Sequence, residues 1–342
     1  MPDFDDSRLE DPAALAEVDP TLRHLAQAGA RLRIESGQAD FSQLADLADG
    51  YRPRAVIASG PESRLVRAVL EPCCPVPFVA WPSHALPAWV GALDLVLVLT
   101  DQTYAPEVSA TVAEAARRGA RVILACPAGS PVAEQAAGRE TTIVATQTGD
   151  PTASAIIMLD GLSRTGLGPE IHPDRVAQAL DEVAEQCSPH QDVASNPAKD
   201  LAIALADDLP LVWGGSVLAA RASRRVAEAL REASGRPALA ADADDLVTLI
   251  QAAPRRDPFA DPFDETRDSR CTTLVVLDDH RDSQAVARAR TPLLALAERH
   301  DVRVRTISHD QGHDVERYAC LLQHGLFAAT YLRLGLGPNL AR

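Results

Sequence analysis

Three short segments of the chain combine hydroxyl and glycine residues directly after a run of apolar residues. They contain Ser59, Gly60 and Ser63 in the first segment, Thr100 and Thr103 in the second, and Gly214, Gly215 and Ser216 in the third. In a parallel α/β sheet, strand ends lead into helix starts, whose free N–H groups and positive dipole attract anions. The segments are therefore candidate phosphate-binding turns. The alternative is that their side chains only cap helices.

Glu232 and two histidines are the candidate acid–base groups. Glu232 stands near the end of a long helical pattern, in the segment LREASGRP, where a carboxylate beside small residues could remove a carbon-bound proton. The alternative is a solvated glutamate at a helix end. His309 and His313 are four residues apart in SHDQGHD, but Gly312 lies between them. We interpret that segment as a polar turn before the last helix and expect no metal site.

Short apolar runs alternate with amphipathic segments from residue 54 onward, as in parallel strands buried on both faces. Strands are predicted at Arg54–Ser59, Val76–Ala80, Asp94–Thr100, Arg121–Cys126 and Thr141–Ala145, and helices at Pro106–Arg118, Pro151–Leu162 and Pro173–Gln186. After the polar stretch SPHQDVASNP, strands follow at Leu209–Trp213, Pro237–Ala240, Thr272–Leu277 and Val302–Thr306, with helices at Val217–Ala233, Gln284–Arg299 and Asp314–Arg333. The repetition predicts two doubly wound sheets.

Two regions fall outside this repetition. Residues 1–50 have an Ala/Leu-rich helical pattern interrupted by Asp and Pro, which predicts a helical lead-in. Residues 254–268, PRRDPFADPFDETRD, are rich in proline and charge and predict a mobile surface loop.

Length and charge exclude several classes of protein. A chain of 342 residues is about twice a typical domain of ~150 residues, which favours two domains. A net charge of −15 without a Lys/Arg-rich run argues against nucleic acid as a partner. The acidic N-terminus and the lack of a long apolar stretch predict a cytoplasmic protein without a membrane segment. No Walker loop or GxGxxG motif is present, and we expect no cofactor.

Two groups of motifs carry a resemblance to a known family. The first is LPAWVG at Leu86–Gly91, followed by DLVLVLT and EAARRGARVILACPAGSPVAEQA; the second is NPAK at Asn196–Lys199, continuing to LPLVWGG. Over roughly residues 50–338 the chain resembles the bifunctional phosphoglucose/phosphomannose isomerases of the SIS (sugar isomerase) superfamily. The resemblance implies an α/β protein with two tandem SIS-type, doubly wound, flavodoxin-like parallel-sheet domains. The expected boundaries are 1–50 for the helical lead-in, 51–165 for the first SIS domain, 166–198 for a helical linker and 199–342 for the second SIS domain with a C-terminal helix.

The resemblance also implies a mechanism and a set of site residues. Family members use a Glu base in an enediol route, a His for ring opening, and a Ser/Thr phosphate pocket shared by the two subunits of a homodimer. Glu232 falls on the base position, in REASGRPA. Thr100 and Thr103 keep hydroxyls in TDQTYAPEV, where the family has SYSGNTEET. The segment Ala243–Asp245 replaces the family's HNE, which removes the ring-opening His.

These departures leave two main functions open, and a third, weaker alternative is another SIS chemistry, such as amino-sugar phosphate processing. The first is an aldose–ketose isomerase acting on glucose 6-phosphate or mannose 6-phosphate, with Glu232 as base and His309 or His313 in place of the missing His. The second is a catalytically degenerate SIS protein that senses a sugar phosphate or binds a partner protein. Each lost acid or base costs about a hundredfold to ten-thousandfold in rate. Lys199, the single lysine, belongs to NPAK and cannot replace the family's late lysine.

Overall fold

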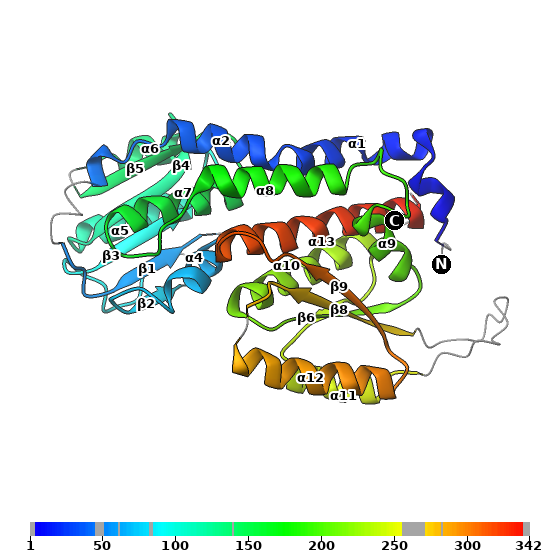
Figure 1. Cartoon of the computed structure of the whole chain (residues 1–342). Helices are drawn as coiled ribbons and strands as arrows, with labels where there is room; N and C mark the ends of the chain where they lie inside the picture. Colours follow the sequence, from blue (N-terminus) through cyan, green and yellow to red (C-terminus); the bar gives the residue numbers. More distant parts are fainter. Residues whose placement is uncertain are drawn as a thin grey trace. The chain divides into compact units, whose positions relative to one another are not determined.

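The computed structural model describes residues 4–44, 51–60, 62–81, 85–138, 140–254, 271–281 and 283–337. The chain forms two compact units. One consists of Ala28–Gln178, and the other joins Met1–Gln27 to Ala179–Arg342. Each contains one sheet, here called sheet A and sheet B (Figure 1). The segment 254–268, predicted to be a mobile loop, lies outside the described residues except for Pro254.

Sheet A is a five-stranded parallel sheet. Its strands are β1 (Val56–Ser59), β2 (Phe78–Ala80), β3 (Leu95–Leu99), β4 (Arg121–Pro127) and β5 (Thr141–Thr146). They lie in the order β2-β1-β3-β4-β5, which is the flavodoxin-like order. The helices of this unit are α2 (Ala28–Gln38), α4 (Ser63–Leu70), α5 (Pro106–Arg117), α6 (Pro131–Ala136) and α7 (Pro151–Arg164), and α8 (Pro173–Gln186) follows them.

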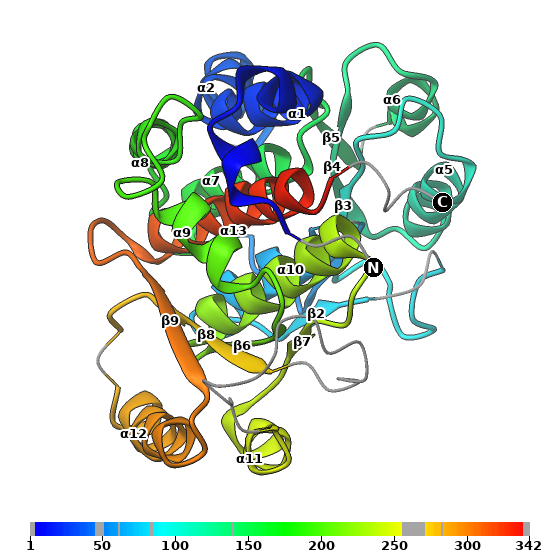
Figure 2. The same ribbon diagram turned by 90° about the vertical axis from the view of Figure 1, so that its right-hand side faces the viewer.

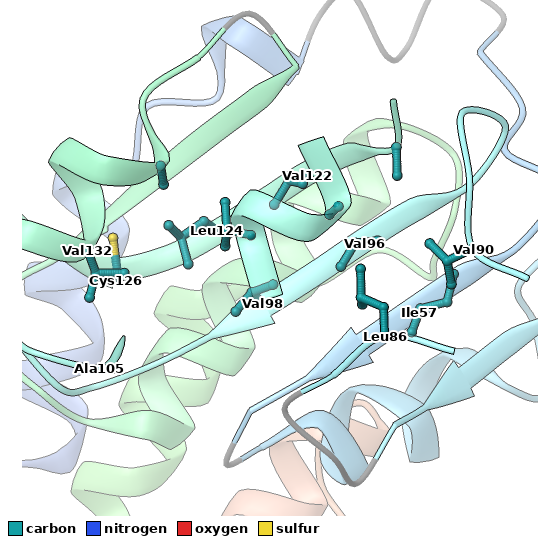
Figure 3. Close-up of a cluster of buried hydrophobic side chains, with 14 of the residues drawn as sticks. Ile57, Leu86, Val90, Val96, Val98, Ala105, Val122, Leu124, Cys126 and Val132 are labelled. Atoms are coloured by element: carbon teal, nitrogen blue, oxygen red, sulfur yellow. The ribbon is translucent and has the colours of Figure 1, made fainter. Parts of the chain in front are cut away.

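Alternation along the strands gives sheet A a core on each face. Ile57, Val96 and Val122 point to one face and pack with Val132 of α6 (Figure 3). Val112 of α5 belongs to the same cluster. The intervening strand residues are also buried, on the face where α4 contacts β1 and α7 contacts β3. Burying one such aliphatic side chain contributes about 1.5–3 kcal/mol. Two covered faces explain why the strands have continuous apolar runs.

Sheet B repeats this order with one strand fewer. Its strands are β6 (Leu209–Gly214), β7 (Leu239–Ala240), β8 (Thr272–Asp278) and β9 (Arg303–Ser308), in the parallel order β7-β6-β8-β9. Helices α11 (Ala243–Gln251) and α12 (Gln284–Arg299) cover one face around Leu246, Leu274 and Leu293. The other helices of the unit are α1 (Pro12–Ala26), α9 (Pro197–Ala204), α10 (Val217–Ser234) and α13 (Asp314–Leu336). The predicted fold class is confirmed.

Helix α13 is buried along most of its length. It packs against α1, α9 and α10 of its own unit, so its surface is apolar on nearly every side. Among the described residues, no helix is long and apolar enough to cross a membrane.

The NPAK segment fixes the start of α9. Asn196 accepts hydrogen bonds from two backbone N–H groups of the first turn, at 3.0 and 3.1 Å. Lys199 is fully buried, and its Nζ donates to the carbonyl oxygens of Pro189 at 3.0 Å and Gln191 at 2.8 Å. The Nζ also lies 5.6 Å from the ring centre of Tyr331. Burial lowers the pKa of Lys199. Lys199 holds the α8–α9 connection in place and is enclosed away from solvent.

A glycine is required at position 60. Gly60 has a φ of +111°, and a Cβ there would lie 1.9 Å from the carbonyl oxygen of Leu99 in β3. We therefore expect Gly60→Ala to lower the free energy of unfolding by about 2–4 kcal/mol. Gly129→Ala is the matched control, because Gly129 has a φ of +63° but no neighbour within 4 Å of a Cβ. Urea unfolding of both variants tests this, and equal losses would contradict the role of the Leu99 contact.

Candidate functional site

The first two predicted turns meet at one edge of sheet A. Strands β1 and β3 are hydrogen-bonded neighbours, with Ser59 opposite Val98, and the chain reverses its direction across the sheet between them. Such a switch point is where ligands bind in open α/β sheets. The structure therefore places Ser59 and Gly60 next to the end of β3, where Thr100 follows. Ser63 and Thr103 lie further along the two turns. We call this region the sheet A switch edge.

Both helices that start at this edge lack a side-chain cap. The residue before α4 is Glu62 and the residue before α5 is Ala105, and neither side chain accepts a hydrogen bond from its helix. Ser130 and Asp150, by contrast, cap α6 and α7, which follow β4 and β5. In α4, however, the Ser63 and Leu65 N–H groups donate to the carbonyl oxygens of Gly60 at 3.2 Å and Glu62 at 2.9 Å. The first turn of α5 therefore offers the backbone N–H groups that are available for an anion.

Side chains at the sheet A switch edge provide hydroxyls and charges of both signs. Ser59, Ser63 and Thr100 are buried, and the Thr100 Oγ1 accepts the Gln102 N–H at 3.2 Å. Thr103 is exposed. The buried carboxyl of Glu62 and the exposed one of Asp101 oppose an anion.

Arg64 is a cationic candidate that the sequence analysis missed. It is exposed in the first turn of α4, directly after the predicted Ser63. Its position in the sequence, next to a predicted anion-binding turn, could have identified it as a candidate phosphate-binding residue. Its guanidinium group can offset the two opposing carboxyls by binding phosphate oxygens.

The third predicted turn has a different environment, at the corresponding edge of sheet B. Ser216 caps α10 by accepting the Ala219 N–H at 3.0 Å, and its hydroxyl donates to the carboxylate of Asp279. Asp279 is buried, so an approaching phosphate would meet a negative charge. A Cβ on Gly214 would lie 2.2 Å from the Ala219 carbonyl carbon. Close packing of β6 on α10 is thus sufficient reason for this glycine.

The candidate base lies apart from the histidines of its own unit. Glu232 is exposed in the last turn of α10, 16 residues after Ser216, which corresponds to about 24 Å along a helix. It therefore lies towards the amino edge of sheet B. His309 follows β9, and His313 precedes α13, both at the carboxyl edge. The structure does not bring Glu232 together with either histidine. No group of three potential metal ligands occurs among the described residues.

Two histidines of the sheet B unit are perturbed by burial. Burial lowers the pKa of half-buried His309, against the opposing effects of Asp310, Glu182 and Glu316. Burial also lowers the pKa of His324 in α13, which is only 7% exposed. As the pH falls through about 6.5, these two histidines become protonated in the unfolded chain before they do so in the folded chain. Stability is therefore fully present above that pH and is lost as the pH falls towards the lowered pKa values.

We expect the free energy of unfolding to decrease between pH 7 and pH 5, by at most about 1.4 kcal/mol per pH unit for each histidine. His324→Gln should make this decrease shallower, because it removes one buried titrating group. His190→Gln, at an exposed histidine, should leave it unchanged. Urea unfolding across this pH range measures the slopes. Parallel curves for all three proteins would contradict the role of His324.

Comparison with known proteins adds a family and a set of similar structures. Residues 194–339 match the family model of the bacterial phospho-glucose isomerase C-terminal SIS domain. A comparison with curated proteins finds no matching relative.

Several solved structures share the fold over almost the whole chain. A glucose-6-phosphate isomerase like protein from Thermus thermophilus has a TM-score of 0.55 and 16% identity, covering 98% of this chain and 93% of that chain. Tagatose-6-phosphate ketose/aldose isomerase from Escherichia coli has a TM-score of 0.61 and 14% identity, with coverage of 95% and 90%. The C-terminal domain of glucosamine-fructose-6-phosphate aminotransferase from Francisella tularensis has a TM-score of 0.63 and 9% identity, with coverage of 92% and 95%. These similarities establish the fold of the chain. The family model identifies residues 194–339 as matching a SIS domain. Residues 194–339 are thus similar to the bacterial phospho-glucose isomerase C-terminal SIS domain, and the fold of the chain is that of these solved structures.

Proposed function

We propose that the chain binds the phosphate group of a phosphorylated sugar at the sheet A switch edge. The observation that carries this proposal is the adjacency of two helix starts without side-chain caps, which favours an anion at that place. The names of two similar structures, a glucose-6-phosphate isomerase like protein and a tagatose-6-phosphate isomerase, fit the same ligand class.

Recognition of the phosphate combines backbone and side-chain donors. The first turn of α5 supplies backbone N–H groups, and the hydroxyls of Ser59 and Thr100 supply further donors. Arg64 adds the positive charge that offsets Glu62 and Asp101. The sugar hydroxyls then extend from the edge towards solvent. A neutral sugar lacks the charge that this arrangement recognises and should bind much more weakly.

Replacing Thr100 tests the site. Thr100→Val keeps the shape of the side chain but removes the hydroxyl, so we expect the Kd for fructose 6-phosphate to rise about fivefold to tenfold. The matched control is Thr111→Val, since Thr111 is also buried but bonds the Glu107 carbonyl within α5. Ligand-induced thermal shifts report the affinity, because a ligand of the folded state raises its stability.

Replacing the exposed Arg64 tests the same site. Arg64→Gln should weaken binding about fivefold, whereas Arg67→Gln, which affects an ion pair with Glu71 at 2.9 Å, should not. Glucose should give no comparable thermal shift. Equal shifts for glucose and glucose 6-phosphate, or binding that neither Thr100→Val nor Arg64→Gln weakens, would contradict a phosphate site at this edge.

The more specific proposal is an aldose–ketose isomerase with Glu232 as base, acting as a homodimer. Glu232 takes the proton from C2 of the open-chain aldose, the enediol forms, and the proton returns to C1 to give the ketose. The exposed carboxylate makes no ion pair or hydrogen bond with the described residues and is free to act. Its separation from His309 and His313 leaves ring opening without a catalyst from those groups. The alternative is a sugar-phosphate sensor or partner-binding scaffold without turnover.

A coupled assay with fructose 6-phosphate separates these functions. If Glu232 is the base, Glu232→Gln should lower kcat by about a hundredfold or more without weakening ligand binding. Glu228→Gln, one turn earlier on α10 beside Arg225, should keep full activity. Ligand-induced stabilisation without turnover in the unsubstituted protein would instead favour the sensor. Equal activity in both variants would exclude Glu232 as base.

A further inference from the structure

A pocket lies within the sheet B unit, along the edge strand β9. It has a volume of about 240 Å³ and is formed by residues of α9, β9 and α13 together with the end of α8. Figure 2 shows β9 at the end of the sheet, with α9 and α13 nearby. Leu201 and Ile307 contribute apolar walls, and Asp200, Arg305, Ser308 and His324 contribute polar ones. We call it the β9 pocket.

Arg305 supplies an unused donor to the β9 pocket. Its Nε is buried and makes no hydrogen bond with the described residues. The closest carboxylate, that of Asp200, lies 3.8 Å away, which is too far for a hydrogen bond. Buried donors are almost always paired, and a guanidinium favours carboxylate or phosphate oxygens. An anionic group of a ligand would satisfy this donor.

His324 supplies an acceptor in the same pocket. The side chain is 7% exposed, and its Nδ1 lies 3.0 Å from the Cys320 carbonyl oxygen. A carbonyl only accepts, so Nδ1 carries the proton and Nε2 of the neutral ring is an acceptor. Burial lowers the pKa of His324 and so favours the neutral ring. Within the described part of the chain, Nε2 has no hydrogen-bond partner.

We propose that the β9 pocket binds a small organic anion that also carries a hydroxyl or ammonium group. The anionic group pairs with Arg305, and the hydroxyl or ammonium donates to Nε2 of His324 or to Asp200. The pocket volume is below the roughly 300–1,000 Å³ of sites for drug-sized ligands, which fits a molecule of a few carbon atoms. This site is separate from the sheet A switch edge, and it does not depend on the proposed function.

Calorimetric titration with four probes tests the site. Glycolate, glycine and glycerol 3-phosphate each combine an anion with a donor and represent the hydroxy-acid, amino-acid and phosphate sources, whereas acetate lacks the donor. We expect saturable binding of at least one of the first three at millimolar concentration, and weaker binding of acetate. When such a probe binds, the ¹⁵N signal of the His324 ring should shift during the titration. The absence of binding by all three, or equal binding of acetate, would overturn the proposal.

Variants on β9 locate the bound anion. Arg305→Gln should weaken binding about tenfold or more, because it removes a charged hydrogen bond. Arg303→Gln is the matched control, since Arg303 is two residues away and bonds the Ala204 carbonyl at 3.3 Å. Urea unfolding checks that both variants fold. If Arg305→Gln does not fold, the His324 signal of the unsubstituted protein still tests the site. Unchanged affinity in folded Arg305→Gln would overturn the proposal.

Discussion

Backbone N–H groups at helix starts need partners, and a parallel sheet brings such starts together along its carboxyl edge. In sheet A, side chains supply those partners at α6 and α7 but not at α4 and α5. The two uncapped starts follow the neighbouring strands β1 and β3. The place where the chain reverses direction across the sheet is thus also where first-turn N–H groups of α5 remain for a ligand. Gly60 supports this arrangement by allowing the turn to pass close to β3.

The two sheets show that one strand order can serve different purposes. Sheet B has its own reversal point between β6 and β8, but Ser216 caps α10 there and Asp279 accepts the Ser216 hydroxyl. In the sheet B unit, the side chain of Ser216 thus uses a first-turn N–H group of α10. In the sheet A unit, no side chain caps α5 in this way. The polar groups that are left over in the sheet B unit lie instead beside its edge strand, at Arg305 and His324.

Local pattern predicted most of the fold. Continuous apolar runs located the strands because both faces of each sheet are covered, and α12 was predicted with its observed bounds. The helical pattern of residues 1–50 was expected to be interrupted by Asp and Pro, yet Pro20 lies inside α1, a helix that packs on α13. Helices α9 and α11 were not predicted, since each is short, with 8 and 9 residues.

The candidate site was less accessible from sequence, because it depends on partners distant in the chain. Asp279 lies 63 residues after Ser216, so nothing near Ser216 indicated that its hydroxyl is used. The missing caps were visible in principle, since Glu62 and Ala105 are not residues that commonly cap helices. The separation of Glu232 from His309 follows from the direction of α10, which leaves the carboxyl edge of β6 and runs back along the sheet.

The buried position of Lys199 has a practical consequence. It is the single lysine of the chain and is fully enclosed, so the folded protein presents no lysine to acylating or alkylating reagents. Labelling at this residue requires the α8–α9 connection to open. Lys199 is thus a natural chemical reporter of unfolding in the sheet B unit, one that needs no introduced probe.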